Sequence, residues 1–145
     1  MKVALKEAQK AYDIGEVPVG CVIVKDNKII ARAHNKRETL QQATAHAEIL
    51  AINKACKKIG YWRLNDCVMY VTLEPCTMCS GAIIQARIQK LYIGATDSKS
   101  GAAGSVLNLF EYNFNHKVII EKNVMKNECQ KILKDFFSNL RINKR

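Results

Sequence analysis

The sequence predicts a single α/β domain, built on a mixed β-sheet with helices on both of its faces. Apolar runs of strand length alternate along the chain with stretches of helical periodicity, an order typical of helices packed against a sheet. A length of 145 residues is in the ordinary single-domain range, so one domain over 1–145 is expected. Hydrophobic residues at 48% and charged residues at 25% are values of a globular chain, not of a disordered or fibrous one.

The first elements expected are a helix and a hairpin. Apolar residues recur at helical spacing from Met1 to Tyr12, and Gly15 is suited to end that helix. Two short apolar runs, 19–24 and 29–33, follow it. Asp26-Asn27 between them is suited to a tight turn, so the two runs predict antiparallel strands.

A polar stretch without periodicity, 36–43, then predicts a loop that leads to a largely buried helix over 46–59. Thr44 is the expected N-cap of this helix. Residues two apart point to nearly opposite sides of a regular helix, so His46 and Glu48 can serve one site only at its N-terminus.

The second half of the chain continues the alternation. A continuous apolar run over 67–73 predicts a buried central strand, which Pro75 ends. Cys76 and Cys79 then share a face of the first turn of a helix, where free amides and the helix dipole stabilise thiolates. The expected elements from there are that helix to about 88, a strand over 90–95, a glycine-bearing loop over 97–105, a short helix over 106–110, a strand over 118–120 and a closing helix over 124–140.

Together His46 and the Cys76/Cys79 pair provide one imidazole and two thiols, which are zinc ligands. Structural zinc sites are normally closed by four protein ligands, whereas catalytic sites keep three and leave a position for water. No fourth ligand stands out, because the remaining cysteines are scattered singly in apolar runs. The motif therefore predicts a catalytic zinc, with one ion in each chain.

Glu48 is left free for a role other than metal binding. Two thiolates weaken zinc as a Lewis acid, so a water there is harder to ionise than at a site of three histidines. A general base beside the metal is then needed, and the same carboxyl group can later give its proton to a leaving nitrogen. These are the requirements of hydrolytic deamination.

At these residues the chain resembles the zinc-dependent nucleoside and nucleobase deaminases, whose signature is His-x-Glu followed by Pro-Cys-x-x-Cys. Within that superfamily it is most similar to the bacterial tRNA adenosine deaminases of the wobble position, and the similarity covers nearly the whole chain. The stretches that carry it beyond the signature are Gly15-Glu16-Val17-Pro18-Val19-Gly20, Leu73-Glu74-Pro75-Cys76, Gly101-Ala102-Ala103-Gly104-Ser105 and Asp135-Phe136-Phe137.

The resemblance implies a three-layer α/β/α cytidine-deaminase-like fold, with a five-stranded sheet and the two metal helices side by side on one face. It implies conversion of adenosine to inosine at position 34 of a tRNA anticodon loop, with Glu48 as the catalytic acid and base. It also implies a homodimer that binds a tRNA anticodon stem-loop. The residues expected to contact the substrate are Asn35, in the base pocket, and Lys99, Ser105, Asn108, Phe137 and Arg141 toward the RNA.

Each of these residues also has a plainer interpretation. Asn35 fits a turn after a strand, the 101–105 loop fits a flexible surface loop, and the basic tail 139–145 fits a frayed end. One residue of the Phe136-Phe137 pair is expected in the core. For the whole protein, the alternatives are a deaminase of a free base or nucleoside, of guanine or cytosine type, and a zinc-stabilised RNA-binding module without catalysis.

Charge and cysteine content indicate the kind of partner and the cellular compartment to expect. A net charge of +10, from 23 Lys and Arg against 13 Asp and Glu, favours a polyanionic partner. The charged N-terminus lacks the apolar core of a signal peptide, and no apolar run reaches membrane-spanning length. We therefore expect a cytoplasmic protein without a membrane partner, whose six cysteines form no disulfides.

Overall fold

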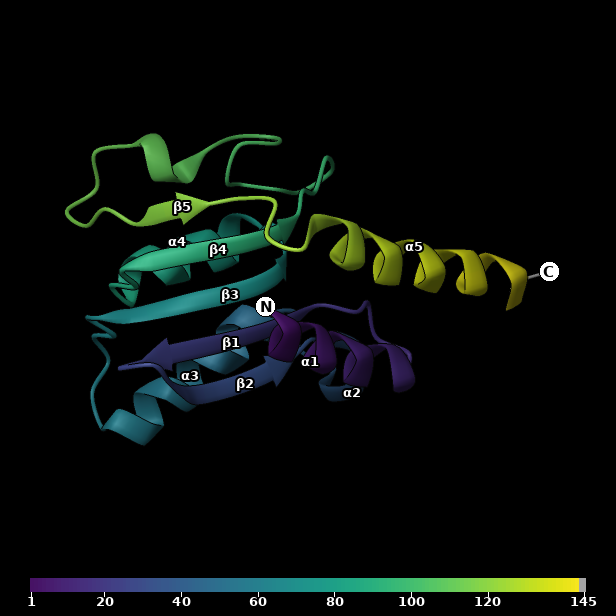
Figure 1. Ribbon diagram of the computed structural model, residues 1–145, viewed down its shortest axis with the longest axis horizontal. Helices are drawn as coiled ribbons and strands as arrows, with labels where there is room; N and C mark the ends of the chain where they lie inside the picture. Colours follow the sequence, from purple (N-terminus) through teal and green to yellow (C-terminus); the bar gives the residue numbers. More distant parts are fainter. Residues whose placement is uncertain (144–145) are drawn as a thin grey trace.

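A five-stranded mixed sheet, in the order β2-β1-β3-β4-β5, runs through the middle of the molecule (Figure 1). The computed structural model describes residues 1–143, so Lys144 and Arg145 lie outside the described residues. The pairs β2-β1 and β1-β3 are antiparallel, and β3-β4 and β4-β5 are parallel. The elements are α1 (Lys2–Asp13), β1 (Gly20–Lys25), β2 (Lys28–His34), α2 (Arg37–Leu40), α3 (Ala47–Ile59), β3 (Cys67–Leu73), α4 (Thr77–Gln85), β4 (Lys90–Ala95), the 3-10 turn η1 (Leu109–Glu111), β5 (Ile119–Glu121) and α5 (Lys126–Asn143).

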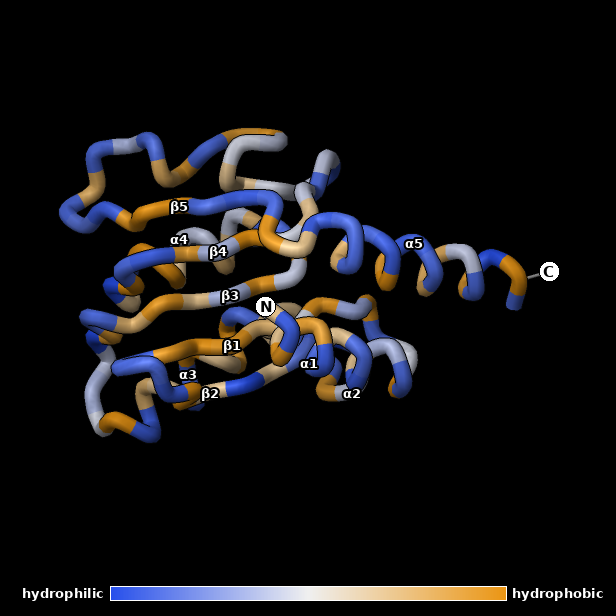
Figure 2. Tube along the Cα trace, viewed as in Figure 1, coloured by the Kyte–Doolittle hydropathy of each residue, from blue (hydrophilic) through white to orange (hydrophobic). Residues whose placement is uncertain are grey.

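Helices cover the two faces of the sheet unequally, which confirms the three-layer α/β/α prediction. Helices α3 and α4 lie side by side on one face, and α1 and α5 lie on the other (Figure 1). The main core lies under α3 and α4, where alternate residues of the strands, such as Ile23, Met69 and Ile93, are fully buried. Figure 2 shows the hydrophobic residues concentrated on the strands, whereas hydrophobic and hydrophilic residues alternate along α5.

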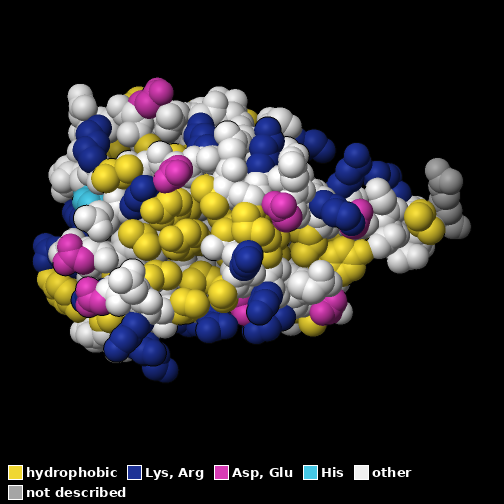
Figure 3. All heavy atoms as spheres, in the orientation of Figure 1, with side chains coloured by type: hydrophobic (Ala, Val, Ile, Leu, Met, Phe, Trp, Pro, Cys, Tyr) yellow, Lys and Arg dark blue, Asp and Glu magenta, His cyan; other side chains and the backbone are white. Residues whose placement is uncertain are grey.

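The face that carries α1 and α5 is only partly covered. Apolar side chains gather over the middle of the sheet there, with Lys and Arg side chains around them (Figure 3). Tyr70 on β3 and Tyr92 on β4 stack on neighbouring strands with ring centroids 4.4 Å apart. Across the described residues, no helix combines the length and apolar character needed to cross a membrane.

Each edge strand of the sheet has a feature that hinders pairing with a further strand. Strand β5 has only three residues. On the opposite border, β2 carries exposed Lys28 and Arg32, and Lys54 Nζ of α3 donates to the Arg32 carbonyl oxygen at 2.9 Å.

The local predictions for the hairpin and the strands are confirmed. Asp26 and Asn27 both have positive φ, at 52° and 62°, as the tight turn requires. The run 67–73 is β3, at the centre of the sheet, and 90–95 is β4.

Several local predictions are wrong, among them the short helix over 106–110, where only the 3-10 turn Leu109–Glu111 forms. Thr44 is not the cap of α3, since the N-cap is His46 and Thr44 instead accepts the His46 N–H with its carbonyl oxygen. The 36–43 stretch is not all loop, because it contains the one-turn helix α2. The helix after Cys76 ends at Gln85 rather than near 88, because Arg87 takes a left-handed φ of 65°.

Candidate metal centre and its pocket

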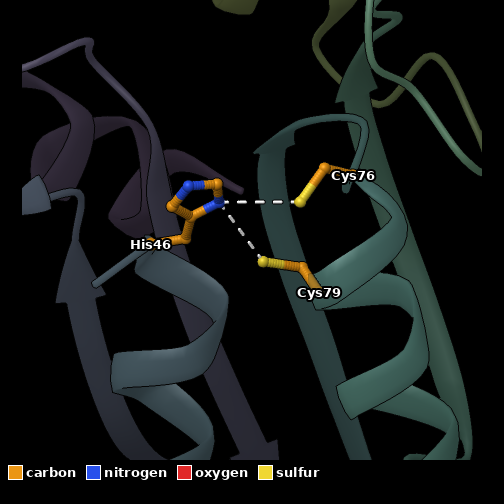
Figure 4. A group of neighbouring side chains, drawn as sticks. All are labelled: His46, Cys76 and Cys79. Carbon is orange, nitrogen blue, oxygen red and sulfur yellow. Dashed lines mark hydrogen bonds between the residues drawn. The ribbon is translucent and has the colours of Figure 1, made fainter. Parts of the chain in front are cut away.

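The three predicted ligands come together at the N-termini of two neighbouring helices. His46 is the N-cap of α3, Cys76 is the N-cap of α4, and Cys79 lies in the first turn of α4. Their side chains point toward one another across the gap between the helices (Figure 4). His46 Nδ1 lies 3.6 Å from Cys76 Sγ and 3.5 Å from Cys79 Sγ, and all three ligand atoms lie within 4.8 Å of one another.

These distances fit a tetrahedral zinc. With Zn–N and Zn–S bonds of about 2.0–2.1 and 2.3 Å, a tetrahedral angle separates nitrogen from sulfur by about 3.5 Å. The donor set of one imidazole and two thiols is likewise one that zinc takes. The described triad therefore has both the spacing and the chemistry of a zinc site with three protein ligands.

The ligands shift one another's pKa values, favouring the thiolate of Cys76 but the protonated forms of Cys79 and His46. Hydrogen bonds from Cys79 and from His46 lower the pKa of the Cys76 thiol to about 4. The hydrogen bond with Cys76 is the largest cause of the raised pKa of His46. Both thiols lie at a helix N-terminus, where free amides favour negative charge.

Glu48 occupies the first turn of α3, beside the triad but outside it. It is buried, and burial is the largest cause that raises its pKa to about 7. A carboxyl group with such a pKa accepts and returns protons readily near neutral pH. Glu48 and two of the ligands, His46 and Cys76, line the same cavity of about 200 Å³.

The cavity opens where β2, β3 and β4 end. The carboxyl ends of these strands lie at the same end of the sheet (Figure 1), and Asn35, Glu74 and Asp97 follow soon after them. Ligands of open α/β sheets commonly bind at this position. The lining residues are Val17, Val19, Asn35, Arg37, His46, Ala47, Glu48, Leu73, Glu74, Cys76, Asp97 and Ser100.

Asn35 lies in this pocket with its amide half used. Its Nδ2 donates to the Val17 carbonyl oxygen at 3.3 Å, and its Oδ1 accepts from the Arg37 amide at 3.2 Å. One N–H and one lone pair remain for a ligand, which suits recognition of a base edge.

The predicted contacts of the 97–110 region lie outside the pocket lining. Lys99 is exposed, and Asn108 Oδ1 accepts from the Phe110 amide as the cap of η1. The Ser105 amide and hydroxyl both donate to Glu74. Their contact with a substrate stays a prediction. Asp97 and Ser100 of the same loop do line the pocket. The sequence analysis predicted the loop but did not name these two residues.

The 101–105 segment is not the flexible surface loop that its composition suggested. Ala102 and Ala103 are fully buried, and their amides donate to Pro75 O and to Glu74 Oε2, both at 2.9 Å. Arg37 is a further lining residue that was missed, because its segment was expected to be irregular.

Helix α5 separates its two phenylalanines. Phe136 is 8% exposed and packs edge-on against Tyr12 of α1, whereas Phe137 is 40% exposed. The tail is helical as far as Asn143, which corrects the frayed-end interpretation for that part, and exposed Arg141 lies on the last turn. The end of α5 extends beyond the body of the molecule (Figure 1). Lys144 and Arg145 of the predicted tail lie outside the described residues.

Comparison with known proteins places this geometry in context. Residues 1–141 match the family model of the MafB19-like deaminases. The chain is 50% identical over 146 aligned positions to the tRNA-specific adenosine deaminase of Bacillus subtilis, covering 100% of this chain and 91% of that protein.

Two solved structures extend the likeness to the fold. One, from a study of A-to-I editing by tRNA:A34 deaminases at the wobble position, is 44% identical, with a TM-score of 0.89 over 92% of this chain and 97% of that one. The guanine deaminase of Bacillus subtilis is 33% identical, with a TM-score of 0.63 over 79% of this chain and 83% of that one.

Proposed function

Because the chain belongs to the MafB19-like deaminase family, among its tRNA-specific adenosine deaminases, we infer that it is a zinc-dependent tRNA adenosine(34) deaminase. It converts adenosine to inosine at the wobble position of an anticodon loop by hydrolysis. The observation that carries this function is a zinc-type triad beside a buried acid, in a chain half identical to a tRNA deaminase over its full length.

A zinc ion held by His46, Cys76 and Cys79, one per chain, would supply the Lewis acid that makes a water acidic enough to attack. Glu48 takes a proton from the attacking water and gives it to N1 of the base. It then takes the second water proton, from the hydroxyl now bonded to C6, and gives it to the nitrogen that leaves C6. One water is consumed and one ammonia is released for each inosine formed. Asn35 orients the base with the N–H and lone pair that its backbone contacts leave unused.

The RNA contacts are proposed from the family resemblance, and charge and exposure support part of them. A loop nucleotide is already poorly stacked, so turning it into the pocket costs less than opening a base pair. Lys99 and Ser105 in the 97–105 loop, Asn108 just after it, and Phe137 and Arg141 on α5 contact the surrounding RNA. Exposed Phe137 is suited to stack on a base, and the net charge of +10 favours the phosphates.

The assembly and the domain organisation rest on the family resemblance and on chain length. Residues 1–145 act as one deaminase domain, and two copies form a homodimer. Sedimentation equilibrium of the purified protein tests the dimer, and a monomer at micromolar concentration would contradict it.

The function is tested by incubating the purified protein with an RNA hairpin that carries adenosine at the first anticodon position. We expect ammonia release and an A-to-G change at that position after reverse transcription and sequencing. The structural likeness to a guanine deaminase makes free guanine, with cytidine beside it, the necessary comparison. Turnover of a free base or nucleoside without turnover of the hairpin would replace this function by the alternative.

A further inference from the structure

Glu74 is a buried carboxylate that holds a pocket loop together. It follows β3 directly, is 3% exposed, and has both oxygens turned toward the 97–105 loop. Its Oε1 accepts from the Asp97 amide at 3.0 Å and from the Ser105 hydroxyl, and its Oε2 accepts from the amides of Ala103 at 2.9 Å and Ser105 at 3.1 Å. The residue thus binds the loop at three places.

These contacts require a carboxylate rather than any polar side chain. Every contact comes from a donor, and three of the four donors are backbone N–H groups, which cannot reverse their roles. A glutamine would turn its NH2 group toward at least one of them.

The loop is also shaped to fit around this carboxylate. A Cβ at Gly101 would lie 2.5 Å from the Asp97 carbonyl oxygen and closer still to the Glu74 carboxylate. Only glycine allows the chain to pass so near. Asp97 and Ser100, the two residues that this loop adds to the pocket lining, are therefore held from inside.

Glu16 is a second buried carboxylate that holds a segment lining the pocket. It is 1% exposed and lies before β1. Its Oε1 accepts from the Glu38 amide at 3.1 Å, and its Oε2 accepts from the Thr39 amide and hydroxyl, both at 2.6 Å. These bonds anchor the one-turn helix α2, whose first residue, Arg37, lines the pocket and donates to Asn35.

We propose that Glu74 and Glu16 are positioning residues for the substrate: each buried carboxylate fixes one polar wall of the pocket before the RNA binds. Glu74 also lines the pocket, but its oxygens accept hydrogen bonds from the 97–105 loop, as those of Glu16 accept from α2, so each acts through the segment that it holds. Without either carboxylate, the metal ligands and Glu48 stay in place. The pocket residues that the carboxylate held become mobile, and substrate binding must then order them. The inference rests on the proposed function for its kinetic test.

The test compares Glu74→Gln and Glu16→Gln with the wild type on the anticodon RNA hairpin. Hydrogen bonds to charged groups are worth enough that Glu74→Gln should raise KM about tenfold, with kcat changed by less than about threefold. Glu16→Gln should raise KM less, because the Thr39 hydroxyl can reverse its role. Zinc content per chain should stay unchanged in both variants.

Amide hydrogen exchange gives a second measurement that does not depend on activity. The amides of Ala103 and Ser105 should exchange on the order of tenfold faster in Glu74→Gln, and those of Glu38 and Thr39 in Glu16→Gln. Should Glu74→Gln fail to fold, Glu16→Gln decides alone, because α2 is a single exposed turn outside the sheet.

Glu7→Gln is the matched control. Glu7 is equally buried, on α1, and pairs with His34 Nδ1 at 3.0 Å and Lys10 Nζ at 2.6 Å, but it does not line the pocket. Its KM and the exchange of the loop amides should match the wild type.

Failure of the proposed function and failure of the positioning role give different results. A wild type that leaves the hairpin unchanged refutes the proposed function, and amide exchange still shows whether the carboxylates hold their walls. A wild type that deaminates the hairpin, with glutamine variants of unchanged KM and unchanged exchange, overturns the positioning role. So does a fall in kcat that only follows zinc loss at constant KM, because that pattern belongs to a general structural role.

Discussion

Glu48 differs from the neighbouring metal ligands in what surrounds it. The ligands exchange hydrogen bonds among themselves, whereas Glu48 is a buried carboxyl whose pKa is raised to about 7, chiefly by burial. His46 and Glu48 are two residues apart, yet both line one pocket because His46 is the N-cap of α3 and Glu48 lies in its first turn. The helix start therefore lets one short motif provide both a ligand and a proton carrier.

Replacing Glu48 by glutamine should separate these two roles. Zinc content should stay near one per chain, because none of the three ligands is changed, while kcat falls by about 10²–10⁴, the usual worth of general acid–base catalysis. Metal analysis and single-turnover assays on the RNA hairpin measure the two quantities. Wild-type turnover by Glu48→Gln would show that the proton carrier lies elsewhere.

The residues that the sequence identified are those whose partners are near in the chain or whose spacing is distinctive. His46, Cys76 and Cys79 could be grouped in advance, because one imidazole and a Cys-x-x-Cys pair form a zinc-ligand set and match the signature that the chain resembles. The engagement of Ser105 with Glu74 could not, since its partner lies 31 positions away in the chain. The same holds for Arg37, whose place depends on a helix anchored by Glu16.

At the scale of elements, the sheet and its main helices could be predicted, but the smallest pieces could not. Apolar periodicity indicated α1 and α3, and apolar runs indicated all five strands, of which all but β5 have buried residues. The four residues of α2 have no such face, and their turn depends on a carboxylate that precedes them by more than twenty residues. The cap of α3 was misplaced for a related reason, since the Thr44 carbonyl accepts the His46 amide in the turn before the helix.

Helix α5 meets the sheet at Gly94 of β4, where a side chain has no room. A Cβ there would lie 2.7 Å from the Thr72 carbonyl oxygen and closer still to Cys129 Sγ on α5. Gly94→Ala should therefore push α5 from the sheet and lower the free energy of unfolding by about 1–3 kcal/mol. Urea denaturation of the zinc-loaded protein measures this.

Gly81→Ala provides the comparison for that experiment. Gly81 is inside α4, and a Cβ there meets nothing within 4 Å. Alanine should raise the free energy of unfolding by about 0.4–1 kcal/mol by restricting the unfolded chain. Equal stabilities of Gly94→Ala and the wild type would contradict the close packing of α5.

For the whole molecule, the basic surplus of +10 makes binding to RNA sensitive to salt. Measured with Glu48→Gln to prevent turnover, log Kd for the RNA hairpin should rise linearly with log salt concentration, by about 0.7 for each single-strand phosphate contacted. Lys99→Ala and Arg141→Ala should each lower that slope by about one phosphate contact.

Lys28→Ala is the control for charge alone, since Lys28 lies in the β1-β2 hairpin, at the end of β2 away from Asn35. The slope of log Kd against log salt concentration for Lys28→Ala should stay that of the wild type. Equal reductions in all three variants would show that RNA responds to overall charge and not to the proposed contacts.

The capped carbonyl on β2 affects how these molecules behave when crowded together. An open border strand invites another chain to continue the sheet, which is a common route to fibrous aggregates. Here a strand of another copy would have to displace the Lys54 ammonium from the Arg32 carbonyl oxygen. It would also approach an edge that already carries positive charge. On the far side, three residues of β5 offer too little backbone to seed such growth. A protein whose central strand β3 is largely apolar can in this way remain dispersed at high concentration.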